Sequence, residues 1–583
     1  MTKVFQYFNR KQWTYILVSL CFIVLQVWLD LKLPDHMSAI TTLVQTEGSA
    51  MADILTHGGW MLLCALGSMA ASMVVGYFAA KVAAGLAKTL REKVYDQVLD
   101  FSMEEVGRFS TASLINRTTN DITQIQTLVA MGLQAIVKAP ILAAWAIVKI
   151  AGKSWQWTAA TAAAVLTLVI ALGITLIFAV PRFKKIQVLT DNLNRVTREH
   201  LTGIRVVRAY NAEGYQEKKF SKANDELTET NLIANRVMAL MSPGMTLINS
   251  GLTLAVYWIG AYMIEAAGIG DKLGIFSDMV VFSNYAMQVI MAFMMLNMIF
   301  ILLPRAQVSA KRICEVLETE SRIQDGAGTQ SEGAGTIEFR HVSFRYPSAG
   351  GNALTDISFT ASAGETVAFI GATGSGKTTL INLIPRFYDV TEGQVLVDGK
   401  DVRLYQQEQL RGRIGYVSQK AVLFSGTVRS NVAYGDSGSI SSDDVEDAVS
   451  IAQATGFVEK MEGGYDAPIS QGGANVSGGQ RQRLSIARAI ARRPEIMIFD
   501  DSFSALDYKT DRALRQELNS RAGETTKLIV AQRISTIRHA DRIIVLEHGK
   551  AVGMGTHEEL MKTCPTYQEI ANSQLSKEEL ENG

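Results

Sequence analysis

The sequence predicts a chain of two parts, an all-α membrane domain with six transmembrane helices followed by an α/β domain. The first 304 residues contain six apolar runs of the length that a membrane-spanning helix needs, about 20 residues. Farther along, short β-branched runs alternate with helical stretches, which is typical of a largely parallel sheet. The chain has 583 residues, more than a single hydrophobic core usually holds.

Composition agrees with a partly membrane-embedded protein. Lys and Arg total 56 and Asp and Glu total 56, so the formal net charge is +0, and binding to nucleic acid is not expected. Charged residues make up only 19% of the chain and the mean hydropathy is +0.13. Part of the protein is therefore expected in the lipid bilayer.

The charge of the connections predicts the orientation of the spans. Basic residues collect between the second and third runs and between the fourth and fifth, whereas the loop Pro34–Gly59 has no Lys or Arg. By the positive-inside rule, both termini and everything after the last run lie on the cytoplasmic side of the cell membrane. The six runs are Trp13–Leu33, Trp60–Ala83, Leu128–Ile150, Trp157–Val180, Pro243–Ile264 and Met279–Leu303.

The two basic connections are predicted to be helical. Neither contains proline between residues 88 and 126 or between residues 182 and 236, and both carry helix formers throughout. We expect the second to fifth spans to continue as helices into the cytoplasm, with short crosswise segments at Phe101–Phe109 and Tyr210–Phe220. The alternative is a disordered basic loop.

Composition also predicts the domain boundaries. Residues 1–320 form the membrane domain, residues 321–335 are a linker rich in Gly, Ser and Glu, and residues 336–583 form the α/β domain. Its expected strands are Thr336–Phe339, Thr366–Ile370, Gln394–Val397, Ile496–Phe499, Lys527–Val530 and Arg542–Leu546.

A glycine-rich loop follows the strand that ends at Ile370. It matches G-x-x-x-x-G-K-[ST] between a strand and a helix, the context in which backbone N–H groups cradle nucleotide phosphates. This predicts a P-loop NTPase; the alternative is a plain glycine-rich turn. The expected binding residues are Gly371, Thr373, Gly374, Ser375, Gly376, Lys377, Thr378 and Thr379.

Asp500 ends a second buried strand, Ile496–Phe499. Next to a P-loop, such a carboxylate is suited to Mg²⁺, which the hydroxyl of Thr378 can also hold. A strand-end Asp without a P-loop would more often be a cap.

Two glycines and a serine open another predicted helix at Ser477, Gly478, Gly479 and Gln480. A second anion-binding helix start makes sense if two chains each close over the other's nucleotide. These residues resemble the signature of the ATP-binding cassette (ABC) family, with Val476 in place of the usual Leu.

The resemblance extends over nearly the whole chain and implies an exporter half-transporter that uses ATP and Mg²⁺. It implies that Tyr346 stacks on adenine, that Gln419 senses Mg²⁺ and contacts the membrane domain, and that Asp507 lies in a loop between the two ATP sites. The crosswise segments would be coupling helices resting on the ATPase domains.

Two residues depart from the family pattern at the expected catalytic positions. Asp501 stands where the family has the Glu that positions the attacking water, and Gln532 stands where it has a switch His. Asp is one methylene shorter, and an amide has no titratable proton. Gln471 also replaces a usual Glu before the signature.

These departures predict that the ATP site on this chain is impaired. A partner half-transporter with an intact catalytic Glu and switch His would then use the intact residues Ser477–Gln480 of this chain. The sequence is thus interpreted as the degenerate half of a heterodimeric exporter.

Substrate prediction rests on the membrane domain. The sixth span is rich in methionine, which suits a pocket for varied amphiphilic compounds but also suits packing or lipid contact. Asp30, Lys32 and Lys138 are charges near membrane depth, where function or snorkelling can explain them. A multidrug exporter is favoured; a peptide or lipid exporter and an ATP-gated channel or regulatory subunit are the alternatives. The methionines are Met279, Met287, Met291, Met294, Met295 and Met298.

Overall fold

The computed structural model describes residues 2–46, 48–151, 154–268, 271–328, 335–347, 349–435, 438, 440–521 and 523–574. Its contacts divide the chain into two compact units. The membrane unit comprises residues 1–99 and 112–319, and the α/β unit comprises residues 100–111 and 320–583. The short segment 100–111 thus groups with the α/β unit although it lies within the membrane half of the sequence.

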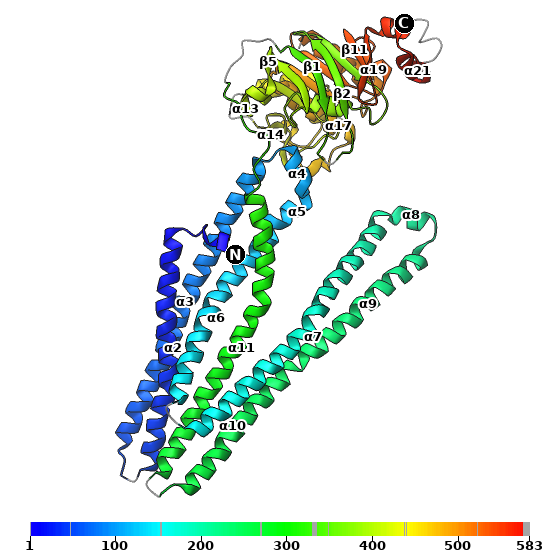
Figure 1. The fold of residues 1–583 in the computed structure, drawn as a ribbon. Coiled ribbons are helices and arrows are strands. Elements are labelled where there is room, and N and C mark those ends of the chain that lie inside the picture. The colour runs from blue at the N-terminus through cyan, green and yellow to red at the C-terminus, as the bar shows by residue number, and fades with distance from the viewer. Residues whose placement is uncertain are drawn as a thin grey trace. The chain divides into compact units, whose positions relative to one another are not determined.

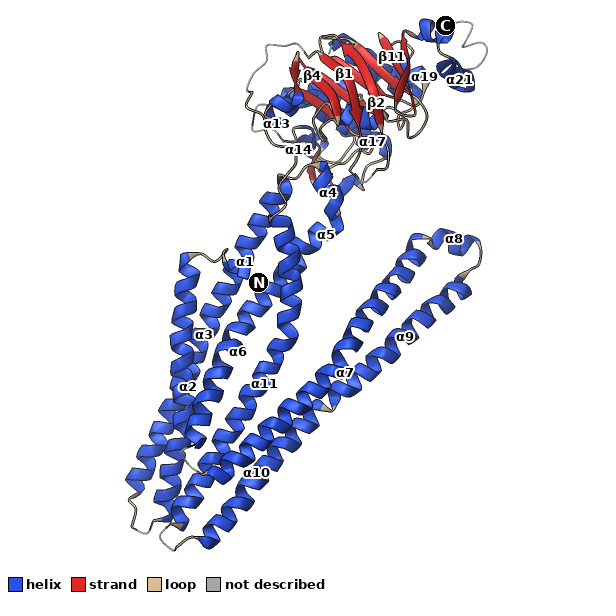
Figure 2. Cartoon of the chain, in the orientation of Figure 1, coloured by secondary structure: helices blue, strands red, loops and turns tan. Residues whose placement is uncertain are grey.

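Helices build the whole described membrane unit (Figures 1 and 2). Six of its helical stretches are long and apolar enough to cross a membrane, which confirms the predicted number of spans. Its helices are α1 (Thr2–Phe5), α2 (Arg10–Gln45), α3 (Met51–Leu99), α5 (Thr111–Asn116), the π-helical turn η1 (Arg117–Asp121), α6 (Ile122–Ala151), α7 (Trp155–Thr202), α8 (Ile204–Ala209), α9 (Glu213–Ala239), α10 (Met241–Ala266) and α11 (Lys272–Leu317).

The prediction that spans continue as long helices is confirmed, but two local expectations are wrong. The expected loop Pro34–Gly59 is mostly helix, because α2 runs to Gln45 and α3 starts at Met51. Pro34 is buried inside α2, where neighbouring helices can compensate for its missing N–H. The second crosswise helix is α8, before Tyr210, and the expected range Tyr210–Phe220 holds a turn and the start of α9.

Helices α2, α3, α6 and α11 run side by side as a bundle, and α10 packs on both α7 and α11 (Figure 1). Their shared core holds large side chains such as Trp157, Phe282 and Tyr285, together with alanines that let helices approach closely. Beyond this core, α7 and α9 pack along each other as an antiparallel hairpin that ends at α8.

Several charged side chains of the bundle are paired. The Lys138 ammonium on α6 lies 3.2 Å from the Asp30 carboxylate on α2, which also accepts a hydrogen bond from the Ser68 hydroxyl on α3. Farther along α2, Asp35 accepts hydrogen bonds from Lys149 at 2.8 Å and from the Tyr285 hydroxyl on α11 at 2.5 Å. These contacts connect the four helices α2, α3, α6 and α11. Asp30 and Lys138, two of the charges singled out from the sequence, are partners of each other.

Removing one member of this pair should destabilise the bundle, because the remaining charge would lose its partner in a poorly solvated place. We expect Asp30→Asn to lower the free energy of unfolding by about 2 kcal/mol, and the double exchange Asp30→Lys with Lys138→Asp to recover part of it. Thermal unfolding in detergent measures both.

The exposed pair Lys88–Glu92 on α3 provides the control. Lys88→Gln should change stability by only a few tenths of a kcal/mol, roughly the value of a surface ion pair on a helix. An Asp30→Asn protein as stable as the wild type would contradict a stabilising role for the pair.

The α/β unit has a six-stranded sheet of order β12-β11-β3-β10-β9-β6, parallel except for β12, and an antiparallel sheet of order β2-β1-β4-β5. The predicted strands at Thr336 and Gln394 thus belong to a separate antiparallel sheet. The strands are β1 (Ile337–Phe344), β2 (Leu354–Ala361), β3 (Thr366–Ile370), β4 (Glu392–Val397), β5 (Lys400–Asp401), β6 (Ile414–Val417), β7 (Gly426–Thr427), β8 (Pro468–Ile469), β9 (Ile496–Asp500), β10 (Thr526–Val530), β11 (Arg542–Glu547) and β12 (Lys550–Gly555).

The side chains of the parallel sheet alternate between two hydrophobic cores. On β3, Val367 and Phe369 face the core shared with the antiparallel sheet, and Ala368 and Ile370 face a second core filled largely by helices. Strands buried on both faces explain why the sequence shows continuous apolar runs here. The helices are α4 (Met103–Phe109), α12 (Lys377–Asn382), α13 (Gln407–Gly412), α14 (Val428–Val432), α15 (Ser442–Ile451), α16 (Thr455–Val458), α17 (Gly478–Ala491), α18 (Tyr508–Arg521), α19 (Ile534–Ile537), α20 (His557–Thr563) and α21 (Pro565–Gln574), with 3₁₀ turns η2 (Val402–Leu404), η3 (Gly464–Asp466) and η4 (Gln471–Gly473).

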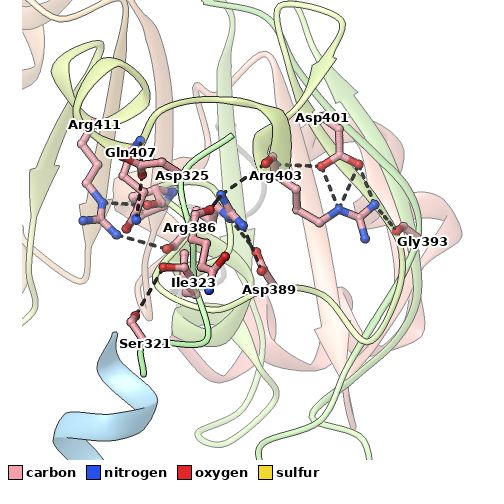
Figure 3. A network of polar contacts seen from close by, with 12 residues as sticks. Ser321, Ile323, Asp325, Arg386, Asp389, Gly393, Asp401, Arg403, Gln407 and Arg411 are labelled. Carbon is pink, nitrogen blue, oxygen red and sulfur yellow. Dashed lines mark hydrogen bonds and ion pairs between the residues drawn. The ribbon is translucent and has the colours of Figure 1, made fainter. Parts of the chain in front are cut away.

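The first part of the expected linker is bonded to the α/β unit (Figure 3). The buried guanidinium of Arg386 donates to the carbonyl oxygen of Gln324 at 2.9 Å and forms a two-point contact with Asp389. The Asp325 carboxylate accepts from the backbone and side chain of Gln407. Residues 321–328 therefore lie along this unit, and residues 329–334 are outside the described part of the chain.

The predicted first crosswise segment is present as α4. Ser102 caps it, and the Glu105 carboxylate accepts a hydrogen bond from the Ser102 backbone N–H at 2.9 Å. Glu104 pairs with Arg322 at 2.8 Å. The Glu104–Arg322 pair links residues 100–111 to the start of the main part of the α/β unit.

Candidate functional site

Three parallel neighbours, β3, β9 and β10, place the predicted site residues at one edge of the sheet. Val530 lies beside Phe369 on one side and Asp500 on the other. The Ala531 N–H donates to the Phe369 carbonyl, and the Asp501 N–H to the Val530 carbonyl. Parallel strands end at the same edge, so segments more than 100 residues apart in the sequence meet there.

The glycine-rich loop after β3 has the conformation that its sequence requires. Gly371 and Gly376 have φ of 154° and 102°. A Cβ atom at Gly371 would overlap the carbonyl oxygen of Leu546, and one at Gly376 would lie 2.9 Å from the carbonyl oxygen of Ala353. Thr373 and Gly374 are exposed at the tip of the loop, and Ser375 is buried.

Lys377 begins α12 and reaches back over this loop. Its ammonium donates to the carbonyl oxygens of Gly371 and Ala372, both at 2.8 Å. Burial lowers the pKa of Lys377, while the nearby carboxylates Asp500 and Asp501 oppose this shift. An anion at the loop would favour the charged form.

The next residue, Thr378, meets the end of β9. Its hydroxyl donates to the Asp500 carboxylate at 2.9 Å. Asp500 is only 3% exposed, and burial raises the pKa of its carboxyl group. A hydroxyl and a carboxylate beside a phosphate-binding loop fit Mg²⁺, which prefers oxygen ligands. Bound there, Mg²⁺ would neutralise phosphate charge.

The two departures from the family pattern bond to each other. The Gln532 amide donates to the Asp501 carboxylate at 2.9 Å, and the Gln419 amide lies 3.5 Å from the same oxygen. Burial raises the pKa of Asp501. Asp501 has φ of 48°, a left-handed conformation that Asp tolerates better than most residues, and its carbonyl accepts from Ser504.

Tyr346 joins the same region through Thr379, whose hydroxyl lies 3.0 Å from the Tyr346 hydroxyl. Its ring packs edge-on against Phe344 and Tyr388, with centroids 4.8 and 5.3 Å away. Tyr388 was not singled out from the sequence, because an isolated aromatic residue carries no motif.

Ser477–Gln480 and Asp507 form a separate group. Ser477 caps α17, and the Gln480 side chain returns to the Ser477 N–H at 2.8 Å. Asp507 caps α18 by accepting from the backbone and hydroxyl of Thr510, and these bonds lower the pKa of Asp507. In the described part of the chain, no hydrogen bond links these residues to the P-loop.

One contact at this edge of the sheet was not predicted from the sequence. Gln574, the last residue of α21, hydrogen-bonds the backbone on both sides of Arg533. No sequence signal indicates it, because the residue is a lone glutamine far along the chain.

Comparison with known proteins decides the family. The family model "ABC transporter" matches residues 354–504, and "ABC transporter transmembrane region" matches residues 13–293. An uncharacterized ABC transporter ATP-binding protein of Mycobacterium tuberculosis is 41% identical over 88% of this chain and 87% of its own length. The chain belongs to the ABC transporter family.

Other ABC proteins resemble the chain at lower identity. An uncharacterized ABC transporter ATP-binding protein of Bacillus subtilis is 36% identical over 88% of each chain. The ATP-dependent lipid A-core flippase of Aromatoleum aromaticum is 31% identical over 86% of this chain and 82% of that protein. A solved bacterial Atm1-family ABC exporter shares the fold, with a TM-score of 0.81, 24% identity and coverage of 97% and 99%.

Family membership gives the chain its general activity. It is a multi-pass membrane protein of ABC exporter fold, and its ABC ATPase domain binds ATP and couples ATP hydrolysis to transport. The expected exporter architecture and ATPase class are confirmed at this level.

The contact between Thr378 and Asp500 predicts a Mg²⁺-dependent binding defect. Thr378→Val should remove a metal-binding hydroxyl and weaken ATP binding in the presence of Mg²⁺ by about tenfold. With EDTA, wild type and variant should bind alike, as measured by photolabelling with azido-ATP. Thr379→Val is the control, because its hydroxyl meets Tyr346 and its effect should be equal with and without Mg²⁺. An equal loss for Thr378→Val in both conditions would contradict the assignment.

Proposed function

We propose that this chain is the degenerate half of a heterodimeric ABC exporter of hydrophobic and amphiphilic compounds in the cell membrane. Its own P-loop binds ATP, and hydrolysis there is impaired. Its signature, Ser477–Gln480, completes the catalytic site of a partner subunit that supplies the catalytic Glu and switch His. Both termini and the ATPase domain face the cytoplasm.

The hydrogen bond between Gln532 and Asp501 carries this proposal. A general base must be within hydrogen-bond reach of the attacking water, and here one of the two Asp501 carboxylate oxygens, Oδ2, already accepts from an amide. Asp501 is also one methylene shorter than the family Glu, and Gln532 cannot exchange a proton as the switch His can. Each change alone impairs catalysis, and the bond between them supports a site that holds ATP and cleaves it slowly.

The signature supports the second half of the proposal. Ser477 caps the 14-residue helix α17, and in its first turn Gly478 is exposed and Gly479 is half-buried. Free N–H groups at a helix start favour an anion such as a nucleotide phosphate. The capping box holds this turn in place, which supports a role for the signature at another chain's P-loop.

Measurements of ATP turnover test whether hydrolysis takes place mainly at the partner's ATP site. In the assembled transporter, Asp501→Glu should alter ATP turnover by less than about threefold, because the partner's site carries most of the hydrolysis. The corresponding Glu→Gln change in the partner should abolish turnover. Full ATPase activity of this chain as a homodimer would overturn the proposal.

The methionines of α11 support an amphiphile-binding surface. Met287, Met291 and Met294 are exposed and recur at helical spacing, so they share one face of α11. Met279 and Met295 instead pack in the helix core, and the Met298 side chain lies outside the described residues. Exposed thioethers can adapt to ligands of varied shape.

Lipid export is the second candidate, favoured by the similarity to lipid A-core flippases. Peptide export and ATP-gated conduction have less support.

Inverted vesicles separate these functions. A multidrug exporter should concentrate a hydrophobic dye when ATP is supplied. The double variant Met287→Ala with Met291→Ala should slow dye uptake about threefold if these methionines contact the dye. Val308, exposed on the same helix, supplies a control through Val308→Ala. Movement of labelled lipid without dye uptake would favour the lipid alternative, and dissipation of a gradient would indicate a channel.

A further inference from the structure

The C-terminal helix α21 contacts residues 531–534, the switch segment that contains Gln532, through Gln574. The Gln574 side-chain oxygen accepts from the Ile534 N–H at 2.9 Å, and its amide nitrogen donates to the Gln532 carbonyl at 2.8 Å. One side chain thus holds the backbone on both sides of Arg533. The two partners, one donor and one acceptor, match the two ends of an amide.

The side chains of Ala531 and Ile534 are buried in the helix-filled core, but the backbone between them has few other hydrogen bonds. The described bonds between β10 and β3 end at Ala531, and α19 begins at Ile534. Arg533, the cap residue of α19, makes no side-chain capping bond, so the Ile534 N–H is a group that helix geometry leaves unsatisfied. Gln574 satisfies it from a different helix.

The body of α21 is firmly docked. Tyr567 and Ala571 are fully buried in the helix-filled core, and the Tyr567 hydroxyl lies 2.7 Å from the His557 imidazole. Thr566 donates to Glu547 at the end of β11. Gln574 is therefore presented by a fixed helix.

We propose that Gln574 is a positioning residue of the ATP site, which sets the orientation of the switch residue Gln532 through its backbone. Gln532 in turn contacts Asp501 at 2.9 Å, so three residues form a chain from the C-terminal helix to the catalytic edge. The proposal rests on ATP binding at this edge, and it holds whether the transporter is a heterodimer or a homodimer.

The resemblance to the ABC family implies that the switch residue meets the terminal phosphate of ATP, so the proposal predicts selectivity between nucleotides. Loss of the two Gln574 hydrogen bonds should weaken ATP binding and leave ADP binding unchanged, since ADP lacks that phosphate. Damage to folding or packing would weaken both. The ratio of the two affinities therefore separates positioning from a merely structural role.

The experiment uses the full-length transporter and photolabelling of this chain with azido-ATP and azido-ADP. Gln574→Met removes both hydrogen bonds at similar size and should raise the apparent Kd for ATP about fivefold, with the Kd for ADP within about twofold. Gln574→Glu keeps the acceptor for the Ile534 N–H but places a carboxylate oxygen against the Gln532 carbonyl, so it should also raise the Kd for ATP and leave the Kd for ADP within about twofold.

Two controls make the result decisive. Gln568→Met removes a comparable bond inside the C-terminal region, from Gln568 to the Met561 carbonyl, and should leave both affinities unchanged. In a Gln532→Ala background, Gln574→Met should add nothing, because its effect passes through Gln532. No change in ATP affinity, equal losses for ATP and ADP, or an undiminished effect without Gln532 would each overturn the proposal. A homodimer with full activity would contradict the degenerate-half proposal without affecting this test.

Discussion

The common edge at which β3, β9 and β10 end is the constraint on which the nucleotide site depends. Hydrogen bonding fixes the register of these strands. The P-loop, the Asp500–Asp501 pair and the switch segment are therefore held close together without any bound ligand. The two hydrophobic cores on opposite faces of the sheet hold the strands in this register. A slip of one residue would exchange the residues facing the two cores, which makes alternative registers costly.

The site keeps charged groups in partial burial by pairing each of them. Lys377 meets loop carbonyls, Asp500 meets Thr378, and Asp501 meets Gln532. Buried polar groups without partners are costly, so these bonds offset much of the desolvation. The bond between Asp501 and Gln532 joins the two residues that depart from the family pattern. The amide donor of one matches the carboxylate acceptor of the other.

Local patterns could be predicted from the sequence, and distant contacts could not. The P-loop and the strand ending at Asp500 were found because a few adjacent residues determine a strand, a turn and a helix start. The second sheet was missed because apolar runs do not reveal which strands pair. Gln574 and the Asp30–Lys138 pair require knowing which helices are neighbours. The first span was expected to end at Leu33, where the apolar run ends, but packed membrane helices tolerate a proline such as Pro34, and α2 continues to Gln45.

The grouping of residues 100–111 with the α/β unit changes how the two units are tethered. Had this segment stayed with the membrane unit, the backbone would pass between the units once, near residue 320. Instead the chain passes between them three times, after residues 99, 111 and 319. The α/β unit is thus joined covalently to the membrane unit at three places in the sequence, and a cut at any one of them would leave the other two connections intact.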